Sequence, residues 1–272
     1  MRHIKLFYFL LPFLATAQNA TKSAKTDSFF ICYGKIMPEK VFGYDVVILE
    51  SQLYNTDEIK QFKAQNNTVI GYISLTEIHP TSTLYEKIKN YTFGKNDIWG
   101  SYYIDIAKPQ AQEIIYQEVD SILQKGFDGL FMDNLDNASQ WGVLKDHKCS
   151  LVQLVKEIKK RHSSIYLMQN AGLFVAKDLK NTTDSILIES VMTAYNFEKN
   201  EYAFREDTSK KNLLQELTTL KKECKKQIYI LEYAASEKMK ETIETSLSKT
   251  TFSFSVANID LQHIPEFKNI NN

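Results

Sequence analysis

Eight short apolar runs, spread over most of the chain, constrain its fold more than any other feature. They are rich in β-branched residues, leucine and aromatics, with few polar interruptions. Such runs are typical of strands that are buried on both faces of a parallel sheet. The predicted strands are Phe29–Tyr33, Asp45–Glu50, Val69–Ser74, Gly129–Asp133, Ile165–Asn170, Ser185–Glu189, Gln227–Glu232 and Thr251–Val256.

Most stretches between these runs have the pattern of helices. The segment Pro109–Lys125 begins with proline and precedes Gly126, whereas Leu151–His162 repeats apolar residues on one side. Further helices are expected at Asp57–Gln65, Lys211–Lys226 and Ser236–Ser248. Because strands and helices alternate without a linker or repeat, the sequence predicts a single α/β domain, a (β/α)8 TIM barrel. No Gly-x-Gly-x-x-Gly follows the first strand, which argues against a dinucleotide-binding fold.

The amino terminus predicts export. Residues 1–17 combine a basic start, an uncharged run from Leu6 to Leu14 and a small-x-small end at Ala15 to Ala17. The apolar run is too short to span a bilayer. We therefore expect a signal peptide of residues 1–17, a polar segment of residues 18–28 and a barrel domain of residues 29–268. The protein would be secreted or periplasmic.

Composition narrows the classes of partner. The formal net charge is zero, so no electrostatic argument favours nucleic acid or an anionic membrane. No later run is apolar enough to cross a membrane. We expect the protein to be a monomer. The cysteines at positions 32, 149 and 224 fit neither a metal site nor a redox CxxC motif, and a Cys149–Cys224 disulfide stays open.

Polar residues, most of them acidic, follow the predicted strands. In a TIM barrel the carboxyl ends of the strands form the mouth, where binding and catalysis occur. The residues at or just beyond these ends are Glu50, Glu77, Asp133, Asp136, Asn170, Glu189 and Glu232, and Asp105 follows a long aromatic insertion over residues 79–104. Since unpaired buried charge is costly, this clustering predicts a functional site.

Two kinds of chemistry use such acids. A metal site is one, although no His-x-His or HExxH motif is present; a cation held by oxygen atoms alone stays open. The other is glycoside hydrolysis, which uses one carboxyl group as acid and another as nucleophile or base. The chain as a whole is neutral, but the predicted mouth is acidic. The negative charge of the mouth predicts attraction of a cationic polymer.

Four segments carry a resemblance to a known family. Residues 126–136, GFDGLFMDNLD, resemble the GFDG-(hydrophobic)-DN-x-D segment of glycoside hydrolase family 114. Residues 71–77, GYISLTE, are similar to its YIS-x-GE strand, residues 167–170 to its Asn-ending fifth strand, and residues 184–189 to its Glu-ending sixth strand. The resemblance implies an endo-α-1,4-polygalactosaminidase. Thr76 departs from the usual glycine, and Ser190–Met192 lacks a cysteine seen in many fungal members.

The resemblance also implies roles for individual residues. Asp133 would be the nucleophile and Glu189 the general acid/base, whereas Asp128 precedes its strand and is interpreted as a structural turn residue. The predicted substrate-binding residues are Tyr72, Glu77, Asp105, Asp136, Asn170, Tyr195, Glu232 and Glu50. A glycan on the sequon at Asn137 would block Asp133, so we expect a bacterial host.

These observations predict an exported, retaining endo-glycosidase that acts on an α-1,4-linked, galactosamine-containing polysaccharide. It would need no organic cofactor and no metal. Two alternatives remain open. One is a non-catalytic glycan-binding barrel, which would need the aromatic insertion but not two neighbouring carboxylates. The other is a metal-dependent hydrolase of sugar esters or amides.

Overall fold

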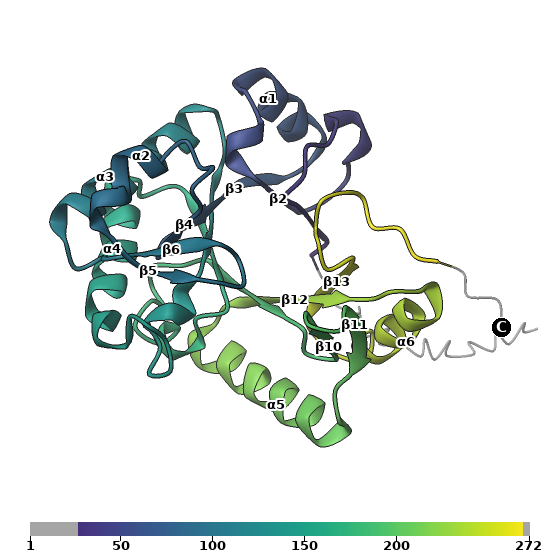
Figure 1. Ribbon diagram of the computed structural model, residues 1–272. Coiled ribbons are helices and arrows are strands. Elements are labelled where there is room, and N and C mark those ends of the chain that lie inside the picture. Colours follow the sequence, from purple (N-terminus) through teal and green to yellow (C-terminus); the bar gives the residue numbers. More distant parts are fainter. Residues whose placement is uncertain (1–26, 269–272) are drawn as a thin grey trace, which may run out of the picture.

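Eight parallel strands form one sheet that curves into a barrel, which confirms the predicted TIM barrel. The computed structural model describes residues 27–268, and Figure 1 shows the barrel with its surrounding helices. The strands, in their order around the sheet, are β1 (Phe29–Cys32), β2 (Val46–Leu49), β3 (Thr68–Ser74), β7 (Gly129–Asp133), β8 (Tyr166–Asn170), β9 (Ser185–Glu189), β12 (Gln227–Tyr233) and β13 (Ser253–Ala257). Beyond the ends of β1 and β13, the Tyr33 amide donates to the Leu261 carbonyl at 2.6 Å and brings the two edges together.

Five long helices cover the outside of the barrel, close to where the sequence predicts them. They are α1 (Thr56–Gln65), α3 (Pro109–Gln124), α4 (Lys148–Arg161), α5 (Asp207–Cys224) and α6 (Glu237–Leu247). Asn55 caps α1 in a capping box with Glu58, and Pro109 begins α3. Within the described residues, β1–β2 and β8–β9 are joined without an α-helix, through the short 3-10 turns Pro38–Lys40 and Leu173–Val175.

Side chains alternate between the barrel interior and the helix layer along each strand. Ile70, Phe131, Met168, Leu187 and Tyr229 belong to one buried cluster that draws on strands all around the barrel, so they fill its interior. Their neighbours on the same strands pack in the clusters beneath the helices. This alternation decides which strand-end side chains open onto the mouth.

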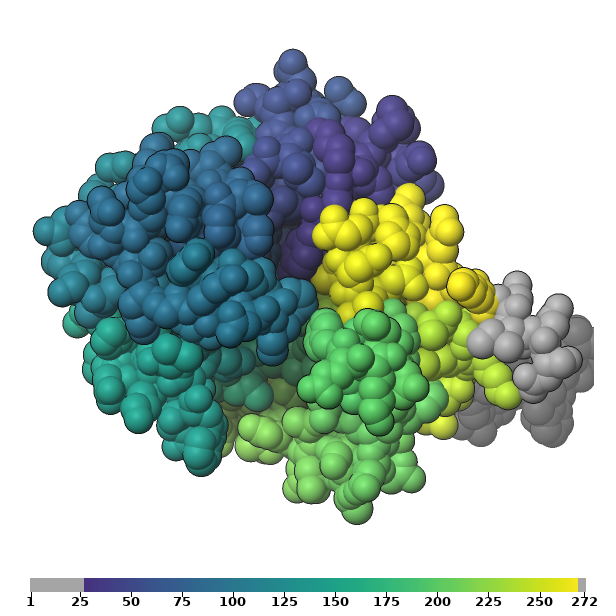
Figure 2. All heavy atoms as spheres, viewed as in Figure 1, coloured from purple at the N-terminus to yellow at the C-terminus, as the bar shows by residue number. Residues whose placement is uncertain are grey.

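Two insertions extend from the carboxyl ends of strands. After β3, residues 77–104 form a three-stranded antiparallel sheet of β4 (Glu77–Ile78), β6 (Ser101–Ile104) and β5 (Thr92–Asn96), with the short helix α2 (Tyr85–Ile88). After β9, β10 (Thr193–Asn196) pairs with β11 (Glu201–Phe204) as a hairpin. Figure 2 shows a recess at the centre of the molecule, between the three-stranded sheet and this hairpin.

Other expectations concern the ends of the chain and its cysteines. Residues 1–17, the predicted signal peptide, lie outside the described residues. From residue 27 to residue 268, no helix is long and apolar enough to cross a membrane. All three cysteines are free: Cys149 is exposed and Cys224 is buried, so the disulfide left open between them is absent.

Candidate active site

The two predicted catalytic carboxylates face each other across one asparagine. Asp133 ends β7, Asn170 ends β8 and Glu189 ends β9, so three neighbouring strands present them at the mouth. The Nδ2 atom of Asn170 donates to Asp133 Oδ1 at 2.9 Å and to Glu189 Oε1 at 2.8 Å. Because both bonds share one nitrogen, these two carboxylate oxygens lie no more than 5.7 Å apart, the sum of the two lengths.

Each carboxylate has a second donor from a tyrosine on the strand beyond it. The Tyr72 hydroxyl, on β3, donates to Asp133 Oδ2 at 2.8 Å. The Tyr233 hydroxyl, at the end of β12, donates to Glu189 Oε2 at 2.5 Å. All four carboxylate oxygens therefore accept a hydrogen bond, which fixes the orientation of both groups.

Sequence reasoning selected Tyr72 but missed Tyr233. Tyr233 lies one residue beyond the predicted strand Gln227–Glu232. The signal that could have found it is the two-residue period of a strand, since Tyr229 and Leu231 also point into the barrel. This alternation, rather than the position of acidic residues, places Tyr233 at the mouth.

The environment of Glu189 favours its protonated form. Burial raises the pKa of this carboxyl group, and the negative charge of Asp133 raises it further. The hydrogen bonds from Tyr233 and Asn170 oppose the rise without cancelling it. Burial and the adjacent carboxylates also hold the pKa values of Tyr72 and Tyr233 well above 10, so both phenols stay protonated as donors.

Glu232 does not open onto the mouth, although the sequence predicts it as a substrate-binding residue. Its neighbours Leu231 and Tyr233 point into the barrel, so the strand alternation turns Glu232 outward. Its fully buried carboxylate accepts from the backbone of Met192 at 2.6 Å and of Thr193 at 3.0 Å. Glu232 thus fixes the loop between β9 and β10.

Glu77 is also buried rather than open at the mouth. Its carboxylate accepts from Asn137 Nδ2 at 2.7 Å, from Asn96 Nδ2 at 3.2 Å and from the Ser101 hydroxyl. These bonds attach the three-stranded sheet to the loop after β7. With its oxygens engaged by the protein, Glu77 is a structural residue in this arrangement rather than a free ligand.

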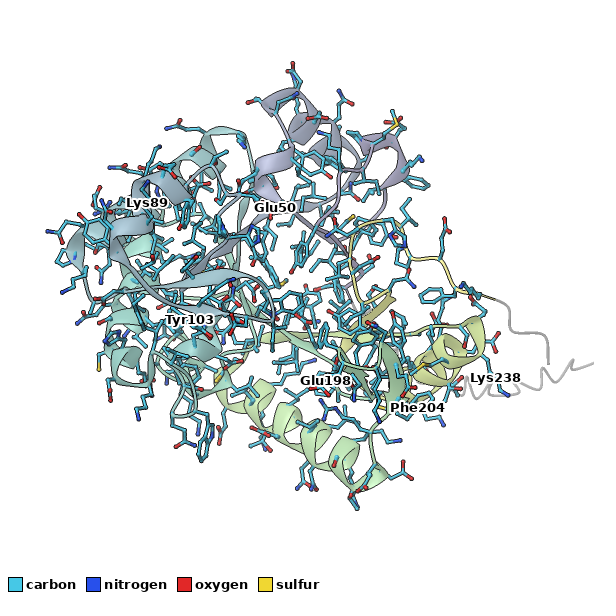
Figure 3. The ribbon with its side chains drawn as sticks, in the orientation of Figure 1. Glu50, Lys89, Tyr103, Glu198, Phe204 and Lys238 are labelled. Atoms are coloured by element: carbon cyan, nitrogen blue, oxygen red, sulfur yellow. The ribbon has the colours of Figure 1, made fainter. Side chains whose placement is uncertain are left out.

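The remaining predicted acids surround the site at different distances. Burial raises the pKa of Asp136, on the turn after β7, and the charge of nearby Asp133 raises it further. Glu50 caps the turn after β2, and its burial raises its pKa; Figure 3 labels it beside β2 and β3. Asp105 follows β6 and lies 3.9 Å from the Lys108 ammonium. Several of the acids that the sequence predicts at the mouth are therefore buried or paired with other groups of the protein.

An aromatic contact joins the two insertions above the barrel. The Trp99 ring, on the turn between β5 and β6, meets the Phe197 ring of the β10–β11 hairpin edge-on at 5.4 Å. Tyr195 packs against Phe197 at 4.9 Å and against Tyr202 at 4.7 Å. Trp99 is 60% exposed and Phe197 49%, so both leave apolar surface free. Figure 3 labels Tyr103 on one insertion and Glu198 on the other.

Metal-ligating groups are not gathered in the same way. Among residues 27–268, no set of three or more His, Cys, Asp or Glu side chains is placed to hold one metal ion.

A shallow depression lined by Leu173, Lys177 and Glu223 lies beside α5, on the outer surface of the barrel. It contains none of the strand-end groups.

Comparisons with known proteins bear on the fold and the family of the chain. The uncharacterized protein MJ1477 of Methanocaldococcus jannaschii is 26% identical over 171 residues, which cover 56% of this chain and 49% of that protein. The glycoside hydrolase domain of PelA from Pseudomonas aeruginosa superimposes with a TM-score of 0.77 at 18% identity, covering 87% of this chain and 96% of that one. Aspergillus fumigatus Ega3, solved in complex with galactosamine, superimposes with a TM-score of 0.68 at 13% identity, covering 89% of this chain and 95% of that one.

At these identities the structural likeness shows a shared fold. A model of glycoside hydrolase family GH114 matches residues 12–271, which is nearly the whole chain. This protein therefore belongs to glycoside hydrolase family GH114.

Proposed function

We propose that the protein is a retaining endo-glycosidase for α-1,4-linked galactosamine polymers, with Asp133 as nucleophile and Glu189 as general acid/base. The observation that carries this proposal is the pair of hydrogen bonds from Asn170 to both carboxylates. Retaining glycosidases place their carboxyl groups about 5–5.5 Å apart, whereas inverting enzymes leave roughly 6.5–9.5 Å for a water molecule. The limit of 5.7 Å between the bridged oxygens favours retention.

The reaction has two steps. A carboxylate oxygen of Asp133 attacks the anomeric carbon, the glycosidic C–O bond breaks, and Glu189 gives its proton to the departing oxygen. A water molecule then attacks the same carbon and passes a proton to Glu189, and the bond to Asp133 breaks. The second step restores the ionised Asp133 and the protonated Glu189.

The surroundings of the two groups suit them to these unequal roles. Tyr72 and Asn170 donate to Asp133, which suits an ionised nucleophile. Glu189 serves as the proton donor, because burial and the charge of Asp133 raise its pKa and favour its protonated form. A carboxyl group whose pKa is raised by burial and by a neighbouring carboxylate is the usual general acid of such sites.

The substrate class rests on the relatives. Ega3 binds galactosamine in its solved complex, and PelA contributes a glycoside hydrolase domain of the same fold. In this chain, the exposed faces of Trp99 and Phe197 border the mouth and offer surfaces on which sugar rings stack. The endo mode, the export of the protein and its action as a monomer belong to the same proposal.

The two alternatives are less well supported by the geometry. A non-catalytic glycan-binding barrel has no need for two carboxylates joined by one amide, with their four oxygens held in place. A metal-dependent hydrolase needs convergent ligands, and the described residues bring no such set together.

Incubation with defined polymers tests the proposal. Purified protein is mixed with α-1,4-polygalactosamine, its N-acetylated form and a neutral α-1,4-glucan, and products are identified by mass spectrometry. We expect oligosaccharides of several sizes from the galactosamine polymers. Release of monosaccharide alone would contradict the endo mode, and equal cleavage of the glucan would contradict the substrate class.

A further inference from the structure

Tyr33 stands at the mouth without a role in the mechanism described above. It directly follows β1, and its ring packs edge-on against Tyr72, with centroids 5.0 Å apart. In the order of the eight strands, β1 is four places from β8, which carries Asn170. Tyr33 therefore lies across the barrel from the amide that joins the two carboxylates.

The hydroxyl of Tyr33 differs from those of the other two mouth tyrosines. The hydroxyls of Tyr72 and Tyr233 each donate to a catalytic carboxylate, whereas the Tyr33 hydroxyl has no hydrogen-bond partner within residues 27–268. The residue is half-buried, and its hydroxyl is not among the fully enclosed unpaired atoms, so it keeps access to the recess. An unpaired polar group in such a partly dry site costs free energy that a ligand can recover.

Electrostatics defines what this hydroxyl can offer. Burial, together with the nearby charges of Asp133 and Glu189, raises the Tyr33 pKa well above 10. The phenol therefore keeps its proton throughout the working range of a glycosidase. A neutral hydroxyl that is influenced by the charges of both carboxylates and bonds to neither is a free donor at the mouth.

We infer that Tyr33 donates a hydrogen bond to an oxygen of the sugar unit that Asp133 attacks. This inference rests on the proposed function. Asn170 and the carboxylates hold one side of that sugar, and Tyr33 contacts it from the opposite side of the barrel. Such a contact fixes the rotation of the ring in the mouth and directs its anomeric carbon toward Asp133.

The substitution Tyr33→Phe removes the hydroxyl and keeps the ring that packs against Tyr72. Tyr44→Phe is its matched control: Tyr44 is also half-buried, but it precedes β2 and so lies at the other end of the barrel. Both variants and the wild type are assayed on α-1,4-linked galactosamine oligosaccharides. We expect kcat/KM of Tyr33→Phe to fall about tenfold, as for one lost hydrogen bond, and that of Tyr44→Phe to stay unchanged.

Two further readouts separate substrate contact from a structural role. The melting temperature of Tyr33→Phe should equal that of the wild type, because the hydroxyl bonds to no group of the described residues. Its pH profile should keep both limbs, since Tyr33 donates to neither carboxylate. In an Asp133→Asn background, which binds without turnover, the substitution should weaken oligosaccharide binding by a similar factor.

The outcomes are distinguishable. If the wild type cleaves the oligosaccharides and Tyr33→Phe stays within twofold of it, the inference is wrong while the proposed function stands. A fall in rate that comes with a lower melting temperature or a shifted pH limb would also overturn it, because Tyr33 would then act through the protein. A wild type that neither binds nor cleaves galactosamine polymers removes the proposed function, and the inference with it.

Discussion

Tyr233 donates a hydrogen bond of 2.5 Å to Glu189, from the strand next to the one that carries the acid. Tyr72 stands in the same relation to Asp133 on the other side, and Asn170 lies between the two carboxylates. The site is therefore a chain of hydrogen bonds across five neighbouring strands, β3, β7, β8, β9 and β12.

The first prediction concerns the two carboxylates. Asp133→Asn and Glu189→Gln keep size and shape but remove the nucleophile or the proton donor. We expect each to lower kcat/KM at least about a hundredfold with little change in melting temperature. Steady-state kinetics and thermal unfolding measure the two effects.

Asp128→Asn is the control for this pair. Asp128 lies before β7, at the far end of the barrel, where it pairs with Lys63 at 2.6 Å and accepts from the Val69 amide at 2.9 Å. Since this pair is partly exposed, its loss should cost no more than about 1 kcal/mol of stability and leave activity intact. A stable but inactive Asp128→Asn beside an active Asp133→Asn would reverse the assignment.

The second prediction uses the pH profile. The hydrogen bond from Tyr233 favours ionised Glu189, so Tyr233→Phe should raise the pKa of Glu189 beyond its already raised value. The alkaline limb of kcat/KM, where the general acid loses its proton, should then move to higher pH. Tyr72→Phe, whose hydroxyl bonds to Asp133 instead, should lose rate and keep the alkaline limb. A limb that moves down in Tyr233→Phe would contradict this account.

The third prediction concerns Glu232. Glu232→Gln puts an amide group opposite the backbone donors of Met192 and Thr193 and leaves polar groups unpaired. We expect a loss of about 1–3 kcal/mol in the free energy of unfolding, measured by urea denaturation. At temperatures where the variant is folded, its KM should match the wild type. A stable variant with a raised KM would restore Glu232 as a substrate ligand.

The strands and their acids could be predicted because buried parallel strands are long enough to be recognised and their ends meet on one face. The direction in which each strand-end side chain points is harder to predict from the sequence than the strand itself. The predicted strand Gln227–Glu232 ends one residue before Tyr233, so the sequence places Glu232 at the mouth and does not select Tyr233. The small sheet within residues 77–104 depends on antiparallel pairing between segments that have no strong pattern of their own.

The fourth prediction concerns the aromatic contact above the mouth. If Trp99 and Phe197 stack on sugar rings away from the cleavage point, Trp99→Ala should raise KM several-fold for a long polymer and have less effect on a short oligosaccharide. Ile98→Ala is the matched control, because Ile98 is an exposed neighbour, 73% accessible, on the same turn. An equal effect of Trp99→Ala on long and short substrates would point to a folding role.

The stereochemistry of the first product tests the central claim most directly. An α-1,4-linked galactosamine oligosaccharide is mixed with the enzyme, and the anomeric proton of the new reducing end is followed by NMR before mutarotation. Attack by Asp133 from within 5.7 Å of Glu189 predicts that the α anomer forms first and later equilibrates with the β anomer. Initial formation of the β anomer would mean direct attack by water, and Asp133 would not be the nucleophile.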